Sequence, residues 1–481
     1  MQAILSWKVY SHLKLFKRCI LIMADGARAD VFGKLLKQGD LPNISKYIVQ
    51  KGSYKNAVTV FPSTTGPAYT PYILGKFPGR CNFPGIRWFD KKEFAKTFFS
   101  LKRFRSYIGH ETYLMNHDIS KDHKTIFEII PDSLSILNEL TRGITAGGDK
   151  TRYSKIYYKL KSHFTNKTNE VDKVSRRILL ANSNRLPDFS FVVYLGIDNY
   201  SHLTHPFHKS VLDSYKIIDE SIGELAESLI KKDMLDDTLL LIVSDHGLSQ
   251  THSHFDLLEY MNRNGFKTFY YPNIFKNLFN ASAANMVSGN SMSNLYFKGK
   301  KSWDDFNTDE ISDFINQLVQ RPEIDILLAK QSNDRIKILS KRGSAKTWID
   351  SENKINYEVM DSDPFGYEAL PPVMTIYESL QNTYNTNYPD ALVQINQLFE
   401  SPRTGDIIVT ASPGHDLRAK HENPEHRSSH GSLIKDHMLV PIAINTDISK
   451  EFIRTVDLFP TILKLLGYEL PQLLDGQSLV D

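Results

Sequence analysis

The sequence is poor in cysteine and has no long apolar run. Its 481 residues include two cysteines, Cys19 and Cys81, which excludes a disulfide framework or a cysteine-rich zinc module. No apolar stretch approaches the roughly 18 residues of a transmembrane helix. Lysine and arginine total 58 against 55 acidic residues, a net charge of +3, so nothing favours a nucleic acid polymer as a partner. With these classes excluded, we expect a globular protein, because hydrophobic residues make up 41% of the sequence and suffice for a large core.

The N-terminal segment lacks the features of a secretion signal. Residues 1–18 mix apolar and basic side chains, without an uninterrupted apolar core or a small-residue cleavage site. We therefore expect no signal peptide and a cytoplasmic protein. Two alternatives stay open for this segment: it packs on the domain, or it forms an amphipathic helix that contacts a membrane through residues 1–18.

Short apolar runs indicate the fold class. Residues 19–24, 191–197 and 239–244 are non-alternating and of strand length, which is typical of strands buried on both faces of a parallel sheet. Residues 406–411 and 438–445 look similar. Apolar residues from Val211 to Leu229 recur at helical spacing. Alternating strands and helices predict an α/β fold with a doubly wound, mostly parallel sheet.

The patterns also suggest how the chain is divided. Residues 1–254 and 406–481 carry the strand and helix signals of the predicted core. Residues 255–405 do not continue these signals cleanly. We therefore predict that 255–405 form an inserted cap that shapes a substrate pocket.

Acidic and histidine side chains follow the three best strands. Asp25, Asp198 and Asp245 come at the three strand ends, and ligands bind outside the carboxyl ends of parallel strands. Three carboxylates at one edge would repel one another unless cations neutralised them. Histidines lie nearby in the sequence or in a short S-S-H-G-S segment, namely His202, His246 and His430. This mixture suits two divalent ions, zinc in preference to manganese or iron.

A candidate nucleophile lies in the segment F-P-S-T-T-G-P, residues 61–67. Pro67 suits the first turn of a helix, which places Thr65 at or just before its start. Thr65 could simply cap that helix. The positive helix end also favours an anion, and a metal-bound threonine hydroxyl there could attack phosphorus. Spacing alone leaves Ser63 and Thr64 as rivals.

Together these motifs resemble the alkaline phosphatase superfamily and, more closely, the type I phosphodiesterase/nucleotide pyrophosphatase family. The resemblance covers residues 18–90, 185–255 and 405–480. The matching motifs are D-G-A-R-A-D at 25–30, F-P-S-T-T-G-P, D-x-x-x-H at 198–202, S-D-H-G at 244–247, H-G-S at 430–432 and R-T-V-D-L-F-P at 454–460. Sulfatases share the fold, but their C-x-P-x-R signature is not matched by C-N-F-P-G at Cys81.

The resemblance implies two zinc sites and a phosphothreonine intermediate at Thr65. One site would use Asp198, His202 and His430, and the other Asp25, Asp245, His246 and the Thr65 hydroxyl. Three carboxylates and one alkoxide would then balance two zinc ions, so a phosphate anion would not be repelled. One position departs from the pattern. Ala68 stands where relatives commonly carry an asparagine, and the Gly66 N–H, Tyr69, Arg28, Arg80 and Arg87 are candidates to replace it.

The expected activity is hydrolysis of a phosphodiester or pyrophosphate bond in a small molecule, either nucleotide-like or a lipid headgroup. Two alternatives share the fold and its ligands. The chain could transfer the phosphoryl group to an alcohol instead of water, or it could be a non-catalytic binding protein that kept the fold.

Overall fold

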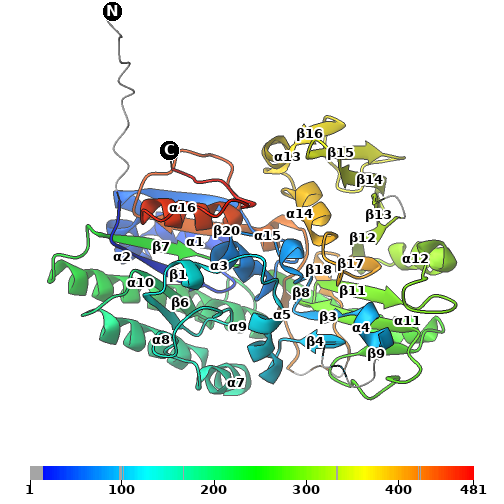
Figure 1. Cartoon of the computed structure of the whole chain (residues 1–481), viewed down its shortest axis with the longest axis horizontal. Helices are drawn as coiled ribbons and strands as arrows, with labels where there is room; N and C mark the ends of the chain where they lie inside the picture. The colour runs from blue at the N-terminus through cyan, green and yellow to red at the C-terminus, as the bar shows by residue number, and fades with distance from the viewer. Residues whose placement is uncertain are drawn as a thin grey trace, which may run out of the picture.

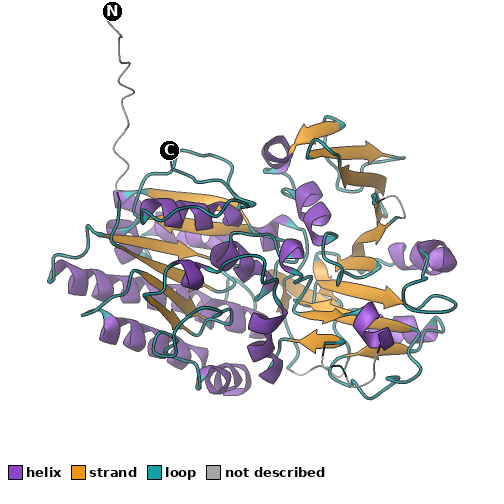
Figure 2. Cartoon of the chain, in the orientation of Figure 1, coloured by secondary structure: helices purple, strands orange, loops and turns teal. Residues whose placement is uncertain are grey.

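The computed structural model describes residues 15–96, 100, 102–165, 167–331, 334–420, 422 and 424–480. Two large sheets lie beside each other, each with its own helices (Figure 1). Figure 2 shows the denser helical layer around the first sheet and the more open arrangement of the second. Within the described residues, no helix has both the length and the apolar character to cross a membrane.

The first sheet is the predicted core sheet. Four of its strands, β7, β1, β6 and the edge strand β5, are parallel, while β20 and β2 pair antiparallel at the other side. Every residue of β6 and β7 is buried, which explains their non-alternating sequences. The expected α/β class with a mostly parallel sheet is confirmed. Its strands in spatial order are β2 (Ser53–Val58), β20 (Leu439–Ile444), β7 (Thr238–Val243), β1 (Arg18–Ala24), β6 (Phe189–Tyr194) and β5 (Ser133–Ile136).

Helices cover both faces of this sheet. On one side α8 (Thr168–Asn182) packs against α10 (Lys209–Ile230), and on the other α3 (Thr70–Leu74) packs against α16 (Leu458–Leu465) (Figure 1). The predicted apolar face from Val211 to Leu229 is buried along α10, as its spacing requires. This cover completes the doubly wound arrangement.

The second sheet is mainly antiparallel. Only β9 and β10 pair in parallel among its described strands. Its strands in spatial order are β16 (Val373–Thr375), β15 (Lys354–Val359), β14 (Gly343–Ile349), β13 (Ile336–Ser340), β12 (Ile324–Lys330), β17 (Ile407–Ala411), β11 (Met292–Phe297), β10 (Ala283–Ser288) and β9 (Thr268–Tyr270).

The prediction that residues 406–411 form a core strand is wrong. β17 pairs antiparallel with β11 and β12 in the second sheet. Its Ile407 and Val409 enter one apolar cluster of that region, and Ile408 enters another. A strand buried on both faces reads the same in either sheet, so its sequence could not assign it. The second sheet thus extends past residue 405, and the boundary of the inserted region stays a prediction.

We call each sheet with its helices a region, the first and the second. The two regions share an apolar cluster. Val58, Phe61 and Ala68 from the first region pack with Leu392 and Leu398 of α14 (Ala391–Leu398) from the second. The second region therefore packs directly on the first and buries the apolar side chains at residues 58–68 that belong to this cluster.

Two further sequence features can be placed. Cys19 and Cys81 are free thiols, both buried. The predicted membrane-contacting segment lies largely outside the described residues, but Phe16 is buried in the apolar core around the first sheet.

The remaining elements complete the two regions. The other elements are α1 (Ala29–Gln38), α2 (Pro42–Tyr47), β3 (Arg87–Phe89), α4 (Lys91–Lys96), β4 (Phe104–Ser106), α5 (Met115–Asp118), α6 (Ile126–Ile129), α7 (Lys155–Thr165), α9 (Gly196–Leu203), β8 (Ser249–His254), α11 (Leu257–Arg263), α12 (Ser312–Val319), α13 (Ile376–Thr383), β18 (Gly414–Asp416), β19 (Ser428–Ser429) and α15 (Lys435–Met438).

Candidate metal centre and active site

Three parallel strands bring aspartates to one edge of the first sheet. Asp25 directly follows β1, and Asp245 comes two residues after the end of β7. The Gly26 N–H donates to Asp245 Oδ1 over 3.1 Å, and the Asp198 N–H donates to the Asp25 carbonyl over 3.0 Å. The three residues that sequence analysis placed at separate strand ends therefore meet.

Asp198 reaches this edge from a helix. β6 ends at Tyr194, short of the predicted end at residue 197, and Asp198 lies in the first turn of α9. Ile197 is apolar and buried at the start of that helix, which made the strand look longer than it is. The helix places His202 one turn after Asp198, with its Nε2 3.3 Å from Asp198 Oδ1.

The start of α9 is fixed by Asp172, a residue that sequence analysis missed. Asp172 lies in α8 and accepts backbone hydrogen bonds from Leu195 over 2.8 Å and from Gly196 over 3.0 Å. Burial raises the pKa of Asp172 to about 7, although these two N–H groups oppose the shift. An aspartate within a helical pattern carries no sequence signal for such a contact.

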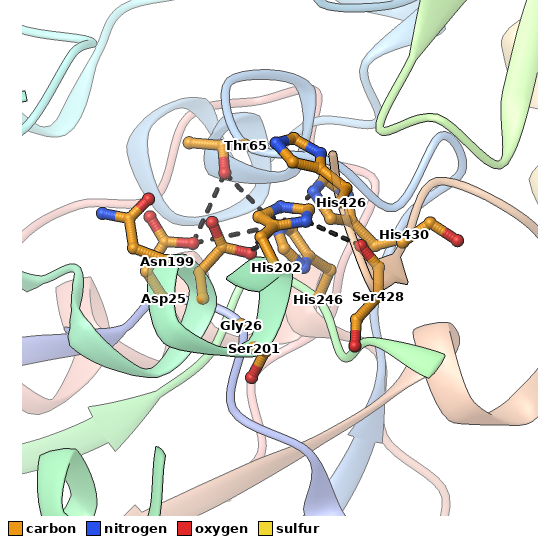
Figure 3. A network of polar contacts seen from close by, with 12 residues as sticks. Asp25, Gly26, Thr65, Asn199, Ser201, His202, His246, His426, Ser428 and His430 are labelled. Atoms are coloured by element: carbon orange, nitrogen blue, oxygen red, sulfur yellow. Dashed lines mark hydrogen bonds and ion pairs between the residues drawn. The ribbon is translucent and has the colours of Figure 1, made fainter. Parts of the chain in front are cut away.

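Thr65 lies beside the aspartates. Its Oγ1 is 3.4 Å from Asp25 Oδ1 and 3.2 Å from His246 Nε2 (Figure 3). The Ser63 hydroxyl instead donates to the Ser432 carbonyl, and the Thr64 hydroxyl is buried with no hydrogen-bond partner among the described residues. Of the three candidate nucleophiles, Thr65 is the one in hydrogen-bonding distance of the acidic and histidine side chains.

The three predicted histidines share one orientation. Each ring places Nδ1 near a backbone carbonyl, which can only accept a hydrogen bond, so Nδ1 carries the proton in the neutral ring. Nε2 is then left with a free electron pair, and in each case it is turned toward the aspartates. The Nδ1 contacts are His202 to Ser428 over 2.8 Å, His246 to Gly247 over 3.1 Å and His430 to Ser63 over 3.0 Å.

Burial and mutual repulsion disfavour the charged form of two of the three carboxyl groups. Burial and the neighbouring Asp245 and Asp198 raise the pKa of Asp25 well above its usual value. Burial likewise raises the pKa of Asp245. Burial also opposes ionisation of Asp198, but His202 outweighs it and lowers the pKa of that carboxyl. Asp198 Oδ1 and Asp245 Oδ2 are buried without a hydrogen-bond partner among the described residues. Each of these two oxygens could therefore donate an electron pair to a metal ion.

The donor set fits divalent cations. Two groups each bring three ligand atoms within 4.8 Å of one another: Asp198 with His246 and His430, and Asp25 with Asp245 and His246. His246 thus reaches both groups, while His202 adds a nitrogen beside Asp198. Burial lowers the pKa of His430 well below its usual value, which keeps it in the neutral form that binds metal.

The second region holds His430 through its backbone. The His430 N–H donates to the Gly289 carbonyl over 2.9 Å, and the Ser291 N–H donates to the His430 carbonyl over 3.0 Å. Gly289 has φ +61°, and a Cβ there would lie 2.6 Å from His430 Nδ1. The turn at 289–291 had no role in the sequence analysis, because the contact is made by the backbone across the chain.

The second region also holds the segment before Thr65. From α14, Gln394 Oε1 accepts from the Phe61 N–H over 3.0 Å, and Gln397 Nε2 donates to the Phe61 carbonyl over 2.7 Å. Gln397 Oε1 further accepts from the Gly79 N–H over 2.9 Å. Both glutamines are buried, so they position the segment rather than meet solvent.

Ala68 does not face the site. It is fully buried in the shared apolar cluster, so an asparagine there would replace a core contact. Among the suggested substitutes, Arg28 pairs with Asp30 and Asp436, and Arg80 pairs with Glu400 and Asp475. Three candidates remain at the site. They are the N–H of Gly66, the residue after Thr65; Tyr69, whose hydroxyl lies 3.5 Å from Asp25 Oδ2; and Arg87, which lines the adjoining cavity and has its Nη1 3.5 Å from Glu422 Oε1.

Two cavities meet at Thr65. One, of about 190 Å³, is lined by apolar side chains such as Ile86 and Val287 and by polar and basic ones that include Arg87, Asn290 and His426. The His426 ring stacks on that of His202 with centroids 4.2 Å apart. The other, of about 280 Å³, is walled mainly by apolar side chains and contains Lys159. Burial lowers the pKa of Lys159 to about 8, an effect that Asp25 partly offsets.

Comparison with known families identifies the sequence. Residues 19–433 match the family model described as "Type I phosphodiesterase / nucleotide pyrophosphatase". A comparison with curated proteins gave no match.

Solved structures share the fold at low sequence identity. Phosphonoacetate hydrolase from Sinorhizobium meliloti 1021, in complex with phosphonoformate, matches with TM-score 0.56 and 12% identity over 94% of this chain and 96% of its own. Murine ectonucleotide pyrophosphatase/phosphodiesterase 5, as an inactive threonine-to-alanine variant with AMP, matches with TM-score 0.54 and 14% identity over 95% and 96%. The human protein of that name matches with TM-score 0.56 and 14% identity over 96% and 97%.

Proposed function

The chain belongs to the type I phosphodiesterase/nucleotide pyrophosphatase family, and from this premise we propose that it hydrolyses a phosphodiester or pyrophosphate bond at a site with two divalent metal ions. The observation that carries the proposal is the convergence of three free imidazole Nε2 atoms, three aspartates and one threonine hydroxyl at a single sheet edge. The sequence-based prediction of a cytoplasmic location is kept as part of this proposal.

We assign the metal ligands as the sequence resemblance divides them. Asp198, His202 and His430 would hold one ion. Asp25, Asp245, His246 and the Thr65 hydroxyl would hold the other. Zinc is the proposed ion and manganese the alternative, because mixed imidazole and carboxylate donors favour both over calcium or magnesium. When bound, the ions would lower the pKa of the threonine hydroxyl and stabilise negative charge on phosphorus-bound oxygens.

Thr65 is the proposed nucleophile. Its Oγ1 gives up its proton and attacks phosphorus, the bond to the leaving alcohol or phosphate breaks as that group takes up a proton, and a phosphothreonine forms. Water then attacks that phosphorus, the bond to Thr65 Oγ1 breaks, and the phosphate or phosphate monoester leaves. Asp25 and His246 lie within 3.4 Å of Oγ1 and orient the hydroxyl before attack. Arg87 would pair with the incoming phosphate anion from the neighbouring cavity wall.

The relatives are consistent with this assignment. The murine relative is an inactive threonine-to-alanine variant in complex with AMP, and the bacterial relative is an enzyme that hydrolyses phosphonoacetate. Both ligands are small and carry phosphorus. We therefore propose a small nucleotide-like or lipid-headgroup phosphate ester as the substrate class.

Metal analysis combined with assays on bis-p-nitrophenyl and mono-p-nitrophenyl phosphate tests the proposal. Thr65→Ala should keep the fold and bound metal but lose at least about a thousandfold in kcat, since the nucleophile is gone. Thr64→Ala is the matched control and should stay within a few-fold of the unmodified protein. A fully active Thr65→Ala protein would falsify the nucleophile assignment. Added alcohol separates hydrolysis from transfer, because a transferase would form a new phosphate ester.

A further inference from the structure

The apolar cavity beside Thr65 contains one charged pair that the proposed reaction does not use. Lys159, on α7, forms an ion pair with Glu139 Oε1. Both residues line the cavity of about 280 Å³ together with Asp25 and Thr65. The pair therefore lies in the same chamber as the nucleophile, away from the cavity that contains Arg87 and His426.

Glu139 has an oxygen without a partner. Its side chain is about 5% exposed, and Oε2 makes no hydrogen bond to any described residue. A buried carboxylate oxygen left unpaired is destabilising, because it has lost its hydrogen bonds to water. Since Lys159 already balances the charge through Oε1, a neutral hydrogen-bond donor suits Oε2 better than a second cation.

A turn in the backbone after β5 positions Glu139. Glu139 follows β5, which lies parallel to β6 at the edge where the aspartates meet. Leu137 has φ +57°, a left-handed conformation that is rare for a bulky residue. Asn138 then closes a local turn by accepting from the Leu140 N–H over 3.1 Å. A strained turn next to a reactive edge is typical of functional positions.

The remaining walls are mainly apolar, apart from Asn199 and the proposed metal ligands. Leu137, Ile156, Leu160 and Leu195 are among the apolar side chains that line the chamber. Its volume is smaller than that of sites that hold a whole drug-sized ligand, so the chamber suits one substituent of the substrate. A mostly apolar wall with an unpaired acceptor at Glu139 Oε2 selects an apolar group that carries one donor.

We propose that this chamber is the subsite for one ester substituent of the substrate, an apolar alkyl or aryl group that carries a hydroxyl, and that the hydroxyl donates to Glu139 Oε2. Lys159 holds the Glu139 carboxylate in place. The other cavity, which contains Arg87 and His426, takes the second substituent, so the substrate is a diester with two unlike groups. This inference rests on the proposed function and extends it to specificity.

Competition between matched inhibitors tests the subsite. A series of ω-hydroxyalkyl phosphates is compared with alkyl phosphates of the same chain length, as inhibitors of bis-p-nitrophenyl phosphate hydrolysis. In the unmodified protein, the best hydroxyalkyl phosphate should have an inhibition constant at least about tenfold below its alkyl partner, as expected for a hydrogen bond to a charged group. In Glu139→Met/Lys159→Met this preference should disappear or reverse.

The control acts on the same helix. Lys161, also on α7, pairs with Glu170 over 2.7 Å outside the chamber. Lys161→Met/Glu170→Met should leave the inhibition ratio unchanged. If the chamber double variant fails to turn over substrate, calorimetry with the same two phosphates gives the ratio directly.

The outcomes separate the two proposals. Hydrolysis with equal inhibition by both phosphates in the unmodified protein, or a ratio that survives in Glu139→Met/Lys159→Met, overturns the subsite and leaves the proposed function standing. Absence of hydrolysis in the unmodified protein, with metal bound, overturns the proposed function instead.

Discussion

The first sheet contributes reactive side chains to the candidate site, and the second contributes contacts that hold them. The first sheet supplies reactive groups, because its parallel strands end together and place Asp25, Asp198 and Asp245 at one edge. The second supplies support. Its Gly289 backbone holds His430, and its α14 holds Phe61 at the start of the segment that contains Thr65. The second region is therefore part of the framework that holds the candidate site, as well as of the cavity wall.

The largest loss of stability is expected when the buried ion pair between the two regions is removed. Arg454, next to the first sheet, donates to both carboxylate oxygens of Asp390 at the start of α14, each over 2.7 Å, and both side chains are buried. Asp390→Ala should lower the free energy of unfolding by about 3–5 kcal/mol, because it leaves a buried charge unpaired. Urea denaturation measures the change.

An exposed pair within the second region is the control for that variant. Lys354 and Glu352 form a surface ion pair over 2.7 Å, so Glu352→Ala should cost less than about 1 kcal/mol. Equal losses for the two variants would mean that the buried pair does not join the regions.

A smaller effect is expected where the second region touches a proposed metal ligand. In Gly289→Ala the new Cβ would press on His430, which should lower kcat/KM and metal affinity by about 10–100-fold, as for residues that orient metal ligands. Gly366→Ala is the matched control. Gly366 also has positive φ, +67°, but has no atom within 4 Å of an added Cβ. Both variants carry the backbone strain, so similar activity in the two would refute the supporting role of Gly289.

The smallest effect, counted per pH unit, is expected at Asp172 in the first region. Asp172 has a pKa raised to about 7 from an ordinary value of 3.8. An acid whose pKa is raised on folding contributes full stability below about pH 4, and loses it as pH rises through 7. Compared with Asp172→Asn, the unmodified protein should therefore lose stability over this window by at most about 1.4 kcal/mol per pH unit. Unfolding curves at several pH values that stay parallel for the two proteins would contradict this assignment.

The sequence predicted the first region better than the second. Strand-end aspartates and short motifs such as S-D-H-G combine a buried strand with a polar residue at a fixed offset, and both signals are local. β5 and β2 were missed because Ser133, Ser135 and Lys55 interrupt their apolar pattern. β17 was assigned to the wrong sheet because burial on both faces does not reveal which strands are its neighbours.

Support contacts escaped sequence analysis for a different reason. Gly289 acts through its carbonyl and its missing side chain, and Gln394 and Gln397 act through amides that pair with a distant backbone. None of these features has a characteristic spacing. Asp172 is similar, since its partners at Leu195 and Gly196 are brought close only by the packing of α8 against β6.

The apolar cluster common to both regions limits how this enzyme can be truncated or recombined with a relative. Phe61 and Ala68 pack in one cluster with Leu392, Leu398 and their neighbours. A chain shortened to the parallel sheet and its helices would therefore expose an apolar surface next to the segment that contains Thr65. Swapping specificity between such proteins therefore means exchanging residues within the chambers, while α14 and the strands beneath it are left in place.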